Sequence, residues 1–476
     1  MSTSDFIALS PVIVVGAAAV AVMMLIAFYR SHILTVLLSV AGLAGSFFAL
    51  FPAAGLAPRA VMPLIVIDGY SLFYMGLILV SGLVVTALSY GYLEGREVTP
   101  EEFYLLLMLA TLGSMVLVSA RHFASFFLGL EVLSVSLYAM IAYVGGAARS
   151  NEAGLKYLVL AGVSSAFLLF GMALVYAGLG TMEFGRIAEK VSIAAGNPLV
   201  ISGLALTVVG IGFKLALAPF HMWTPDVYEG APAPVAAFIA TVSKGAVFAL
   251  LLRFLGGTDL QSYRPLFLIF SLLSIASMLA GSLLALFQQN VKRILAYSSI
   301  AHLGYLVVAF LAGGRLAVTA VSYYVAAYFV TMLGAFGVVT LLSGKQGDAE
   351  SLDDYRGLAG QRPWLAGIFT AMLLSLGGIP LTAGFIGKFY VVAAGANSAL
   401  WLLVVILAAS SAIGLFYYLR IVAVLFMPGA EKKDTQGTVS FPGGFATVCL
   451  AAVLFLLGIY PSFLIDLIRT AMNTVH

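Results

Sequence analysis

The stretch GIGFKLALAPFHMWTPDVYEG, residues 210–230, decides the fold of this chain. It is apolar enough to lie in a membrane, yet it carries Lys214 near its start and Pro219 five residues later. Proline lacks a backbone N–H donor and breaks a helix, and a charged side chain at the centre of a membrane helix costs roughly 2.5–3.5 kcal/mol. The stretch therefore predicts a membrane helix that is interrupted near mid-membrane beside a functional lysine.

Composition sets the class of protein around that stretch. Of 476 residues, 62% are hydrophobic, well above the near-half apolar share of soluble domains. Only 9% of the residues are charged. The net charge of +3 is spread over loops without basic clusters, which argues against a nucleic-acid partner. The single cysteine, Cys449, excludes internal disulfides and cysteine-rich metal sites. The N-terminal segment has no basic region before its apolar run, so we expect an uncleaved helix there.

Apolar segments of about 20 residues, the length that crosses a bilayer, follow one another along the whole chain. They predict an all-α polytopic membrane protein with fourteen transmembrane helices in a single domain, residues 1–476. The expected spans are 8–28, 32–51, 71–92, 103–119, 122–144, 154–178, 198–229, 232–255, 265–287, 295–312, 316–343, 363–395, 399–427 and 441–466.

A second expected span, the twelfth, is built like the seventh. In SLGGIPLTAGFIGKFYV, residues 375–391, two glycines and Pro380 precede Lys388. Broken helices in corresponding positions of two halves are the sequence sign of a transporter with inverted repeats. We therefore expect two inverted five-helix repeats, residues 103–255 and 265–427, with broken helices 7 and 12.

Four ionisable side chains lie deep in these spans: Glu131, Lys214, Lys244 and Lys388. Loss of water favours the neutral form of a lysine, and a nearby carboxylate favours the charged form. A change in the distance between Glu131 and Lys214 would therefore load or release a proton. Arginine does not deprotonate in proteins, and all three buried bases are lysines. This pattern indicates a proton path.

Each of these residues also has a simpler interpretation. Glu131 and Lys214 would fit a static ion pair, and the other two lysines would fit side chains that snorkel to the membrane surface. His221 and His302 are either proton relays or hydrogen-bonded core histidines. Because intramembrane charges are usually functional, the proton path is the favoured hypothesis.

The distribution of positive charge predicts the orientation. Without the three buried lysines, 20 Lys and Arg remain, of which 12 fall on the odd-numbered connections and 8 on the other side. The positive-inside rule then places both termini outside the cytoplasm. The twelve are Arg30, Arg96, Arg149, Lys156, Lys292, Arg293, Lys345, Arg356, Arg362, Arg420, Lys432 and Lys433.

Redox chemistry within the chain has little support in the sequence. The five histidines do not recur on one helix face, so paired haem ligation is not indicated. Neither a Walker A motif nor a GxGxxG fingerprint is present. A quinone pocket stays open, because apolar clefts leave no reliable mark in a sequence.

Three motifs in order carry a family resemblance: residues 212–248, residues 288–305 (QQNVKRILAYSSIAHLGY) and residues 377–391. The chain resembles the antiporter-like membrane subunits of respiratory complex I, the NADH-quinone oxidoreductase, and the resemblance spans nearly its whole length. It implies a proton-translocating subunit that has neighbouring membrane subunits as partners and lies in a bacterial inner (plasma) membrane. The charge distribution above then places both termini on the periplasmic side. NAD, FMN, iron–sulfur clusters and quinone would then belong to other subunits, with no cofactor or metal in this chain.

The resemblance also implies roles for the buried residues. Glu131 would pair with Lys214, Lys244 would be the central relay, and Lys388 would be the exit toward the outer side. His221, His302, Tyr305 and Ser243 are candidate relays between them. Quinone reduction elsewhere in the complex would drive the transfer.

Three other functions stay open from the sequence alone. A subunit of a multi-subunit cation/proton antiporter would share the architecture, and sodium-dependent transport would identify it. A structural scaffold subunit would tolerate replacement of its buried lysines. A quinone-binding enzyme acting alone would reduce quinone as an isolated subunit.

Overall fold

The computed structural model describes residues 2–144, 148–191, 193–194, 196–258, 260–261, 263–345, 347–428 and 439–472. These residues form twenty α-helices, a π-helical turn, a 3-10 turn and one antiparallel hairpin. In chain order they are α1 (Thr3–Phe28), α2 (His32–Ala54), β1 (Arg59–Val61), β2 (Ile65–Ile67), α3 (Gly69–Leu93), α4 (Pro100–Ser119), α5 (Phe123–Ile141), α6 (Ala148–Leu179), α7 (Phe184–Val191), α8 (Pro198–Leu215), α9 (Trp223–Gly230), α10 (Ala233–Phe238), η1 (Ile239–Ser243), α11 (Lys244–Leu255), α12 (Arg264–Leu286), α13 (Val291–Ala312), α14 (Gly314–Leu342), η2 (Leu352–Tyr355), α15 (Leu358–Gln361), α16 (Pro363–Gly377), α17 (Ala383–Asn397), α18 (Trp401–Phe426), α19 (Phe441–Ile459) and α20 (Ser462–Met472).

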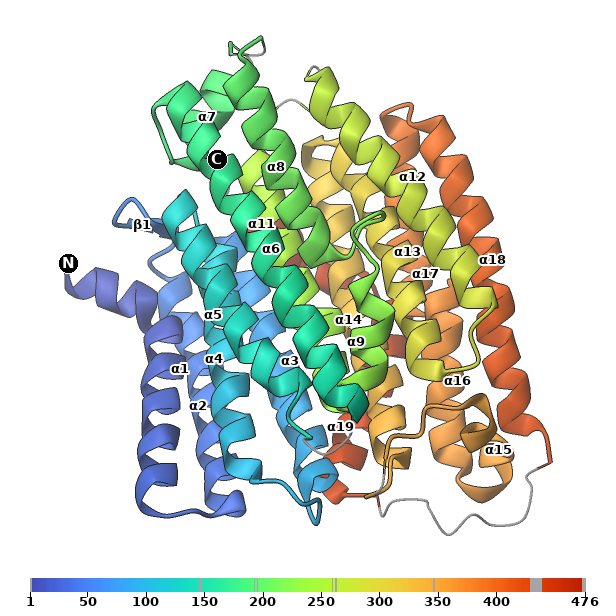
Figure 1. Ribbon diagram of the computed structural model, residues 1–476. Coiled ribbons are helices and arrows are strands. Elements are labelled where there is room, and N and C mark those ends of the chain that lie inside the picture. Colours follow the sequence, from blue (N-terminus) through green and yellow to red (C-terminus); the bar gives the residue numbers. More distant parts are fainter. Residues whose placement is uncertain are drawn as a thin grey trace.

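The helices stand side by side as a membrane bundle (Figure 1). Within the described residues, thirteen segments are long and apolar enough to cross a membrane. The shorter apolar helix α16, continued by α17, forms one further crossing. The polytopic, predominantly helical fold expected from the sequence is therefore confirmed.

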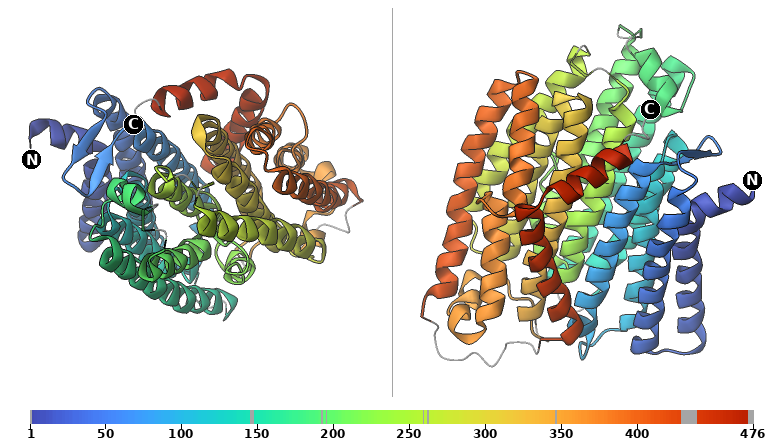
Figure 2. Two further views of the ribbon diagram at one scale, coloured as in Figure 1. Left: turned by 90° about the horizontal axis from the view of Figure 1, so that it is seen from above. Right: turned by 180° about the vertical axis from the view of Figure 1, so that it is seen from behind.

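Two details differ from the expected all-α fold. Residues 59–67 form a short hairpin in which Arg59 pairs with Ile67, because Pro58 and Pro63 oppose a helix there and β-branched residues favour strands. The predicted span 441–466 is wrong at its end, because α19 stops at Ile459. Pro461 follows, and proline cannot continue the hydrogen-bond ladder of a helix. The chain then turns, and α20 lies across α3 and α14 (Figure 2).

Burial divides the crossings into two groups. Nearly every side chain of α10–α11, α13 and α14 is buried in the bundle, whereas α1 and α2 bury only one face. A helix that is apolar all round and buried on all sides is the centre of a large bundle. The polar side chains of the three inner crossings therefore lie away from lipid.

Backbone irregularities fall on the segments that carry the lysines. The seventh crossing is divided into α8 and α9, and the twelfth into α16 and α17. The eighth crossing contains η1, a π-helical turn that ends at Ser243, directly before Lys244. Single wide turns of this kind are frequent at functional sites. Each of the three buried lysines thus lies beside a departure from regular helix.

The bundle has an upper and a lower end as drawn in Figure 1. The upper end carries the N-terminal segment and the β1–β2 hairpin, and the lower end carries the loop before α4, the loop before α13 and α15. Ten of the twelve Lys and Arg assigned above to one side lie in the connections at the lower end or in the helix segments near them. Lys432 and Lys433 lie outside the described residues.

Candidate functional site

The four ionisable residues predicted from the sequence lie on four separate crossings. Glu131 is on α5, Lys214 is in the last turn of α8, Lys244 begins α11 and Lys388 is on α17. The side chains of Lys214 and Lys244 are buried, with 3% and 1% of their residue surface exposed. Glu131 and Lys388 are partly exposed. The set therefore has a closed middle and two ends near the surface of the isolated subunit.

Serine hydroxyls occupy the place of a direct contact between Glu131 and Lys214. Ser165 donates to Glu131 Oε1 at 2.6 Å, and Lys214 Nζ donates to Ser134 Oγ at 2.6 Å. None of the ion pairs among the described residues joins Glu131 to Lys214. Ser134 follows Glu131 by three residues on α5, so both face α6 and α8 from one side of that helix. The arrangement differs from the static ion pair considered above, because each charge has a serine hydroxyl as its hydrogen-bond partner.

The aromatic side chains around Lys214 position the end of α8. Lys214 Nζ lies 5.5 Å from the centroid of the Tyr157 ring. The Trp223 indole Nε1 donates to the Phe213 carbonyl at 2.9 Å. An indole is a donor only, so it satisfies one of the carbonyls that every helix C-terminus leaves free. The break after α8 is therefore closed by an aromatic side chain from α9.

Lys244 lies at the centre of the bundle with a hydroxyl and a ring as neighbours. Its Nζ donates to Ser299 Oγ on α13 at 2.7 Å and lies 5.1 Å from the centroid of the Tyr228 ring. The Tyr228 hydroxyl is 3.4 Å from the same Ser299 Oγ. Only one of the three ammonium N–H groups has a protein acceptor among the described hydrogen bonds, which leaves donors for water.

His302 lies one turn after Ser299 on α13 and continues the line. Its Nδ1 is 2.7 Å from the Tyr324 hydroxyl, and its Nε2 is 3.2 Å from the Tyr418 hydroxyl. Tyr418 also hydrogen-bonds to Ser298, the neighbour of the serine that holds Lys244. Both interpretations of His302, a proton relay and a hydrogen-bonded core histidine, fit these contacts, since each ring nitrogen has a hydroxyl partner.

Lys388 is held more tightly than the other two lysines. Its Nζ donates to the carbonyls of Leu376 and Gly377 at 2.7 and 3.0 Å and to Ser411 Oγ at 2.7 Å. It lies 5.5 Å from the centroid of the Tyr305 ring, which is itself 5.2 Å from the His302 ring. The ring of Tyr305 therefore contacts both Lys388 and His302.

The two remaining candidates have different surroundings. His221 is buried in the break between α8 and α9, and neither of its ring nitrogens has a hydrogen-bond partner among the described groups. A buried ring with two unsatisfied nitrogens is a place for ordered water. Ser243 is buried in η1 beside Lys244. The described hydrogen bonds do not join Lys214 to Lys244, so transfer between them would require water.

The sequence had no direct signal for most of the hydroxyl groups at this site. Serine and tyrosine are common in apolar spans, and only the packing of separate helices brings their hydroxyl groups to the lysines. The one available hint was the SS pair in AYSSIAHLGY, one turn before His302. The missed residues are Ser134, Ser165, Tyr228, Ser298, Ser299, Tyr324, Ser411 and Tyr418.

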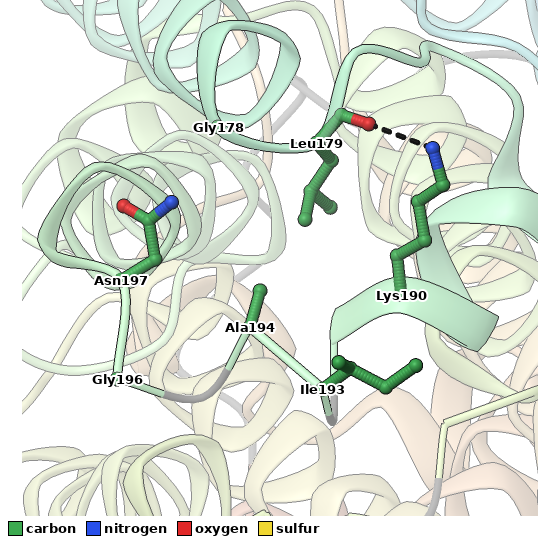
Figure 3. Close-up of a pocket in the computed structure, with 7 residues that line it drawn as sticks. All are labelled: Gly178, Leu179, Lys190, Ile193, Ala194, Gly196 and Asn197. Atoms are coloured by element: carbon green, nitrogen blue, oxygen red, sulfur yellow. Dashed lines mark hydrogen bonds between the residues drawn. The ribbon is translucent and has the colours of Figure 1, made fainter.

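A pocket of about 460 Å³ lies elsewhere, at the upper ends of α6 and α8. Figure 3 shows Lys190 and Asn197 on its wall, with Lys190 Nζ donating to the Leu179 carbonyl at 2.9 Å. None of the predicted site residues lines it. Among the described residues, no group of three or more His, Cys, Asp or Glu side chains could hold a metal ion.

Comparison with known proteins relates the chain to one family of membrane proteins. The family model described as NADH:quinone oxidoreductase/Mrp antiporter matches residues 120–414. NADH-quinone oxidoreductase subunit N of Ectopseudomonas mendocina is 48% identical, covering 99% of this chain and 97% of that protein. The motif TPDVYEGAPAPV at residues 224–235 and the lysine at position 388 favour the same subunit.

Solved structures agree with this relationship. A chain of respiratory complex I from Thermus thermophilus with bound aureothin matches with a TM-score of 0.83 and 33% identity, over 96% of this chain and 98% of that chain. A chain of the Mrp complex from Dietzia sp. DQ12-45-1b matches with a TM-score of 0.87 at 18% identity, over 100% and 98% of the two chains. At that identity the second match concerns the fold alone.

Proposed function

The chain belongs to the NADH:quinone oxidoreductase/Mrp antiporter family of membrane proteins, and we propose that it translocates protons as a membrane subunit of NADH-quinone oxidoreductase. The path runs through Glu131, Lys214, Lys244 and Lys388. The observation that carries the proposal is the line of hydroxyl and imidazole groups that accompanies these residues across the buried centre of the bundle. Ordered water completes the line where side chains do not touch.

In this proposal each lysine exchanges a proton with its neighbours and takes no part in electron transfer. His302, between two tyrosine hydroxyls, accepts on one ring nitrogen while the other donates, so it passes a proton between α14 and α18. Tyr305 then leads to Lys388, the exit toward the outer side. His221 and Ser243 hold water beside Lys214 and Lys244.

The assembly around the chain follows from the same proposal. NAD, FMN, iron–sulfur clusters and quinone bind to other subunits, and the redox reaction there drives proton movement here. The partners are the neighbouring antiporter-like and small membrane subunits. The location is a bacterial inner membrane with the lower end in the cytoplasm and both termini in the periplasm, which the Lys and Arg at the lower end support.

The internal organisation proposed here is two inverted repeats, residues 103–255 and 265–427. In both units the first helix packs on the second and on the fifth, namely α4 on α5 and α11, and α12 on α13 and α18. The third helix packs on the broken crossing in both, namely α6 on α8 and α14 on α16 and α17. Superposition of the two units after inversion across the membrane plane tests the repeat.

The replacement Lys244→Met tests the function. We expect the complex to assemble and both proton pumping and coupled NADH oxidation to fall more than tenfold, because methionine fills the space but carries no proton. Both are measured in membrane vesicles. The matched control is Lys190→Met, a lysine of the upper pocket far from the line, which we expect to leave pumping unchanged.

Three outcomes would contradict the proposal. Normal pumping by an assembled Lys244→Met complex would favour a scaffold subunit with inert lysines. Pumping that depends on sodium would favour a cation/proton antiporter subunit. Quinone reduction by the isolated chain would favour a quinone-binding enzyme.

A further inference from the structure

A fourth buried lysine, Lys292, lies outside the proposed path. It is 1% exposed at the lower end of α13. Its Nζ donates to Asp348 Oδ2 at 2.7 Å, to the Glu229 carbonyl at 2.8 Å and to the Ala231 carbonyl at 2.7 Å. These three bonds use all the N–H groups of an ammonium. Lys292 has no donor left for a chain of water, unlike Lys244.

Two of these acceptors are carbonyls at the end of α9. The last carbonyls of a helix have no partner in the helix, and a lysine can satisfy them. Lys292 therefore fixes the lower end of the seventh crossing and the first residues of the eighth to α13. The attachment is a clamp between Lys292, Asp348, Glu229 and Ala231, hereafter the Lys292 clamp.

Asp348 supplies the charge that makes this burial possible. Burial alone would raise the pKa of Asp348, but Lys292 and Arg96 hold that pKa below its ordinary value. The Tyr92 hydroxyl donates to Asp348 Oδ1 at 2.7 Å, and Arg96 lies 3.6 Å from the same oxygen. A buried ion pair is tolerated when further hydrogen bonds satisfy both partners, as they do here.

The loop that carries Asp348 is itself fixed to α13. The Val291 N–H donates to the Glu350 carbonyl at 2.6 Å, and the Leu352 N–H donates to the Gln289 carbonyl at 3.1 Å. The clamp therefore has a rigid support on one side. On the other side, a Cβ at Gly230 would lie 2.6 Å from Ala153 Cβ and 2.7 Å from the Arg149 carbonyl, so α9 ends in close contact with α6.

The clamp lies two helical turns below the neighbours of Lys244. Lys292 and Ser299 are seven residues apart, so they lie on one face of α13 at a separation of about 10 Å. Tyr228, directly before Glu229, reaches Ser299 with its hydroxyl and covers Lys244 with its ring. The segment 228–231 is thus attached to α13 at two levels, and the lower attachment determines where the Tyr228 ring lies.

We propose that Lys292 is a positioning residue, which with Asp348 holds the end of α9 so that the Tyr228 ring stays against Lys244. The inference rests on the proposed function of Lys244 as a proton carrier. The clamp holds and does not relay. By keeping Tyr228 in place it prevents protons from reaching Lys244 from the lower surface without turnover.

The test separates positioning from folding with four variants of the intact complex in proteoliposomes. Lys292→Met leaves Asp348 buried without its partner, and we expect poor assembly. The double variant Lys292→Met/Asp348→Asn removes both charges of this pair, while Arg96 keeps its hydrogen bond to the Gly344 carbonyl and its place over the Tyr92 ring. We therefore expect the double variant to recover its assembly while the two carbonyls stay free. We expect it to pump at least twofold fewer protons per electron pair and to show at least twofold faster passive proton leak without NADH. Lys292→Arg retains the charge, and we expect its proton ratio and its passive leak to lie close to those of the wild type.

Tyr228→Leu removes the ring that the clamp positions and leaves every ion pair intact, so its result does not depend on how the charge variants fold. We expect the same loss of coupling and the same leak. A normal proton ratio and leak in Tyr228→Leu, or in an assembled double variant, would overturn the inference. If those variants are normal while Lys244→Met abolishes pumping, only the clamp is wrong; if Lys244→Met also pumps normally, the proposed function itself fails.

Discussion

The two broken crossings end their first halves in the same way but receive their lysines from opposite sides. After α8, the Leu217 N–H donates to the Gly212 carbonyl at 2.8 Å; after α16, the Ile379 N–H donates to the Leu374 carbonyl at 3.0 Å. Both are six-to-one bonds of a helix that closes with a left-handed residue. That residue is Ala216 in the first break and Gly378 in the second.

The lysines make different use of these ends. Lys214 belongs to the last turn of α8 and points to a serine of another helix, while backbone N–H groups and Trp223 satisfy the carbonyls near it. Lys388 follows its break and reaches back to two carbonyls of α16. The negative end of a helix dipole attracts a cation in either arrangement. The comparison shows that a helix terminus can position a lysine from either direction. Lys214 makes one described hydrogen bond, to a serine, whereas Lys388 makes three, two of them to the helix end itself.

The largest expected difference between the two breaks concerns stability. Lys388→Met would leave the Leu376 and Gly377 carbonyls without a donor, and a buried unsatisfied group costs about 1–3 kcal/mol. Lys214→Met would leave Ser134, which also donates to the Leu130 carbonyl and stays satisfied. We expect both variants to lose pumping, but only the first to lower the thermal midpoint of the purified complex. Equal midpoints would contradict the structural role of Lys388.

A smaller effect should follow from exchanging the left-handed residues. Gly378→Ala places a Cβ at φ +82°, where it would lie 2.8 Å from Lys388 Cδ. The left-handed conformation costs a residue with a Cβ roughly 1–2 kcal/mol, and the contact adds to that cost. Ala216→Gly, at φ 57°, relieves the same strain and should stabilise by up to ~1 kcal/mol. The thermal midpoint should fall in Gly378→Ala and rise in Ala216→Gly. An unchanged thermal midpoint in Gly378→Ala would show that Lys388 moves aside freely.

The smallest expected effect is a pH dependence at the other end of the seventh crossing. Lys292 has Asp348 as its counter-charge there, whereas the ion pairs among the described residues do not include Lys388. Because the pKa of Asp348 is held below its ordinary value, its stabilising contribution is complete above about pH 4 and is lost as the pH falls through the folded pKa. The difference in thermal midpoint between the wild type and Lys292→Met/Asp348→Asn, which removes both charges of the pair, should therefore be constant near neutral pH and narrow below about pH 4. If the difference in thermal midpoint instead widens on acidification, the pKa of Asp348 is not held below its ordinary value in the folded protein.

The sequence predicted the crossings because each depends on a local property, a run of about 20 apolar residues. It also predicted where two of them break, since Pro219 and Pro380 cannot continue a helix. The turn before α20 was missed although Pro461 marks it, because Phe463, Leu464 and Ile465 continue the apolar run. The hairpin at residues 59–67 was missed because its strands are only three residues long.

What the sequence by itself determined is the cost of burial: three lysines and one glutamate in apolar spans must have partners or a function. Which partners they have was decided only by the tertiary structure. The distance between Glu131 and Lys214, and the serine that binds each of them, depend on how α5, α6 and α8 pack, and no local pattern encodes that register. The same holds for Lys292, which reads as a loop residue in the sequence and becomes buried because α9, α13 and the loop at Asp348 meet around it.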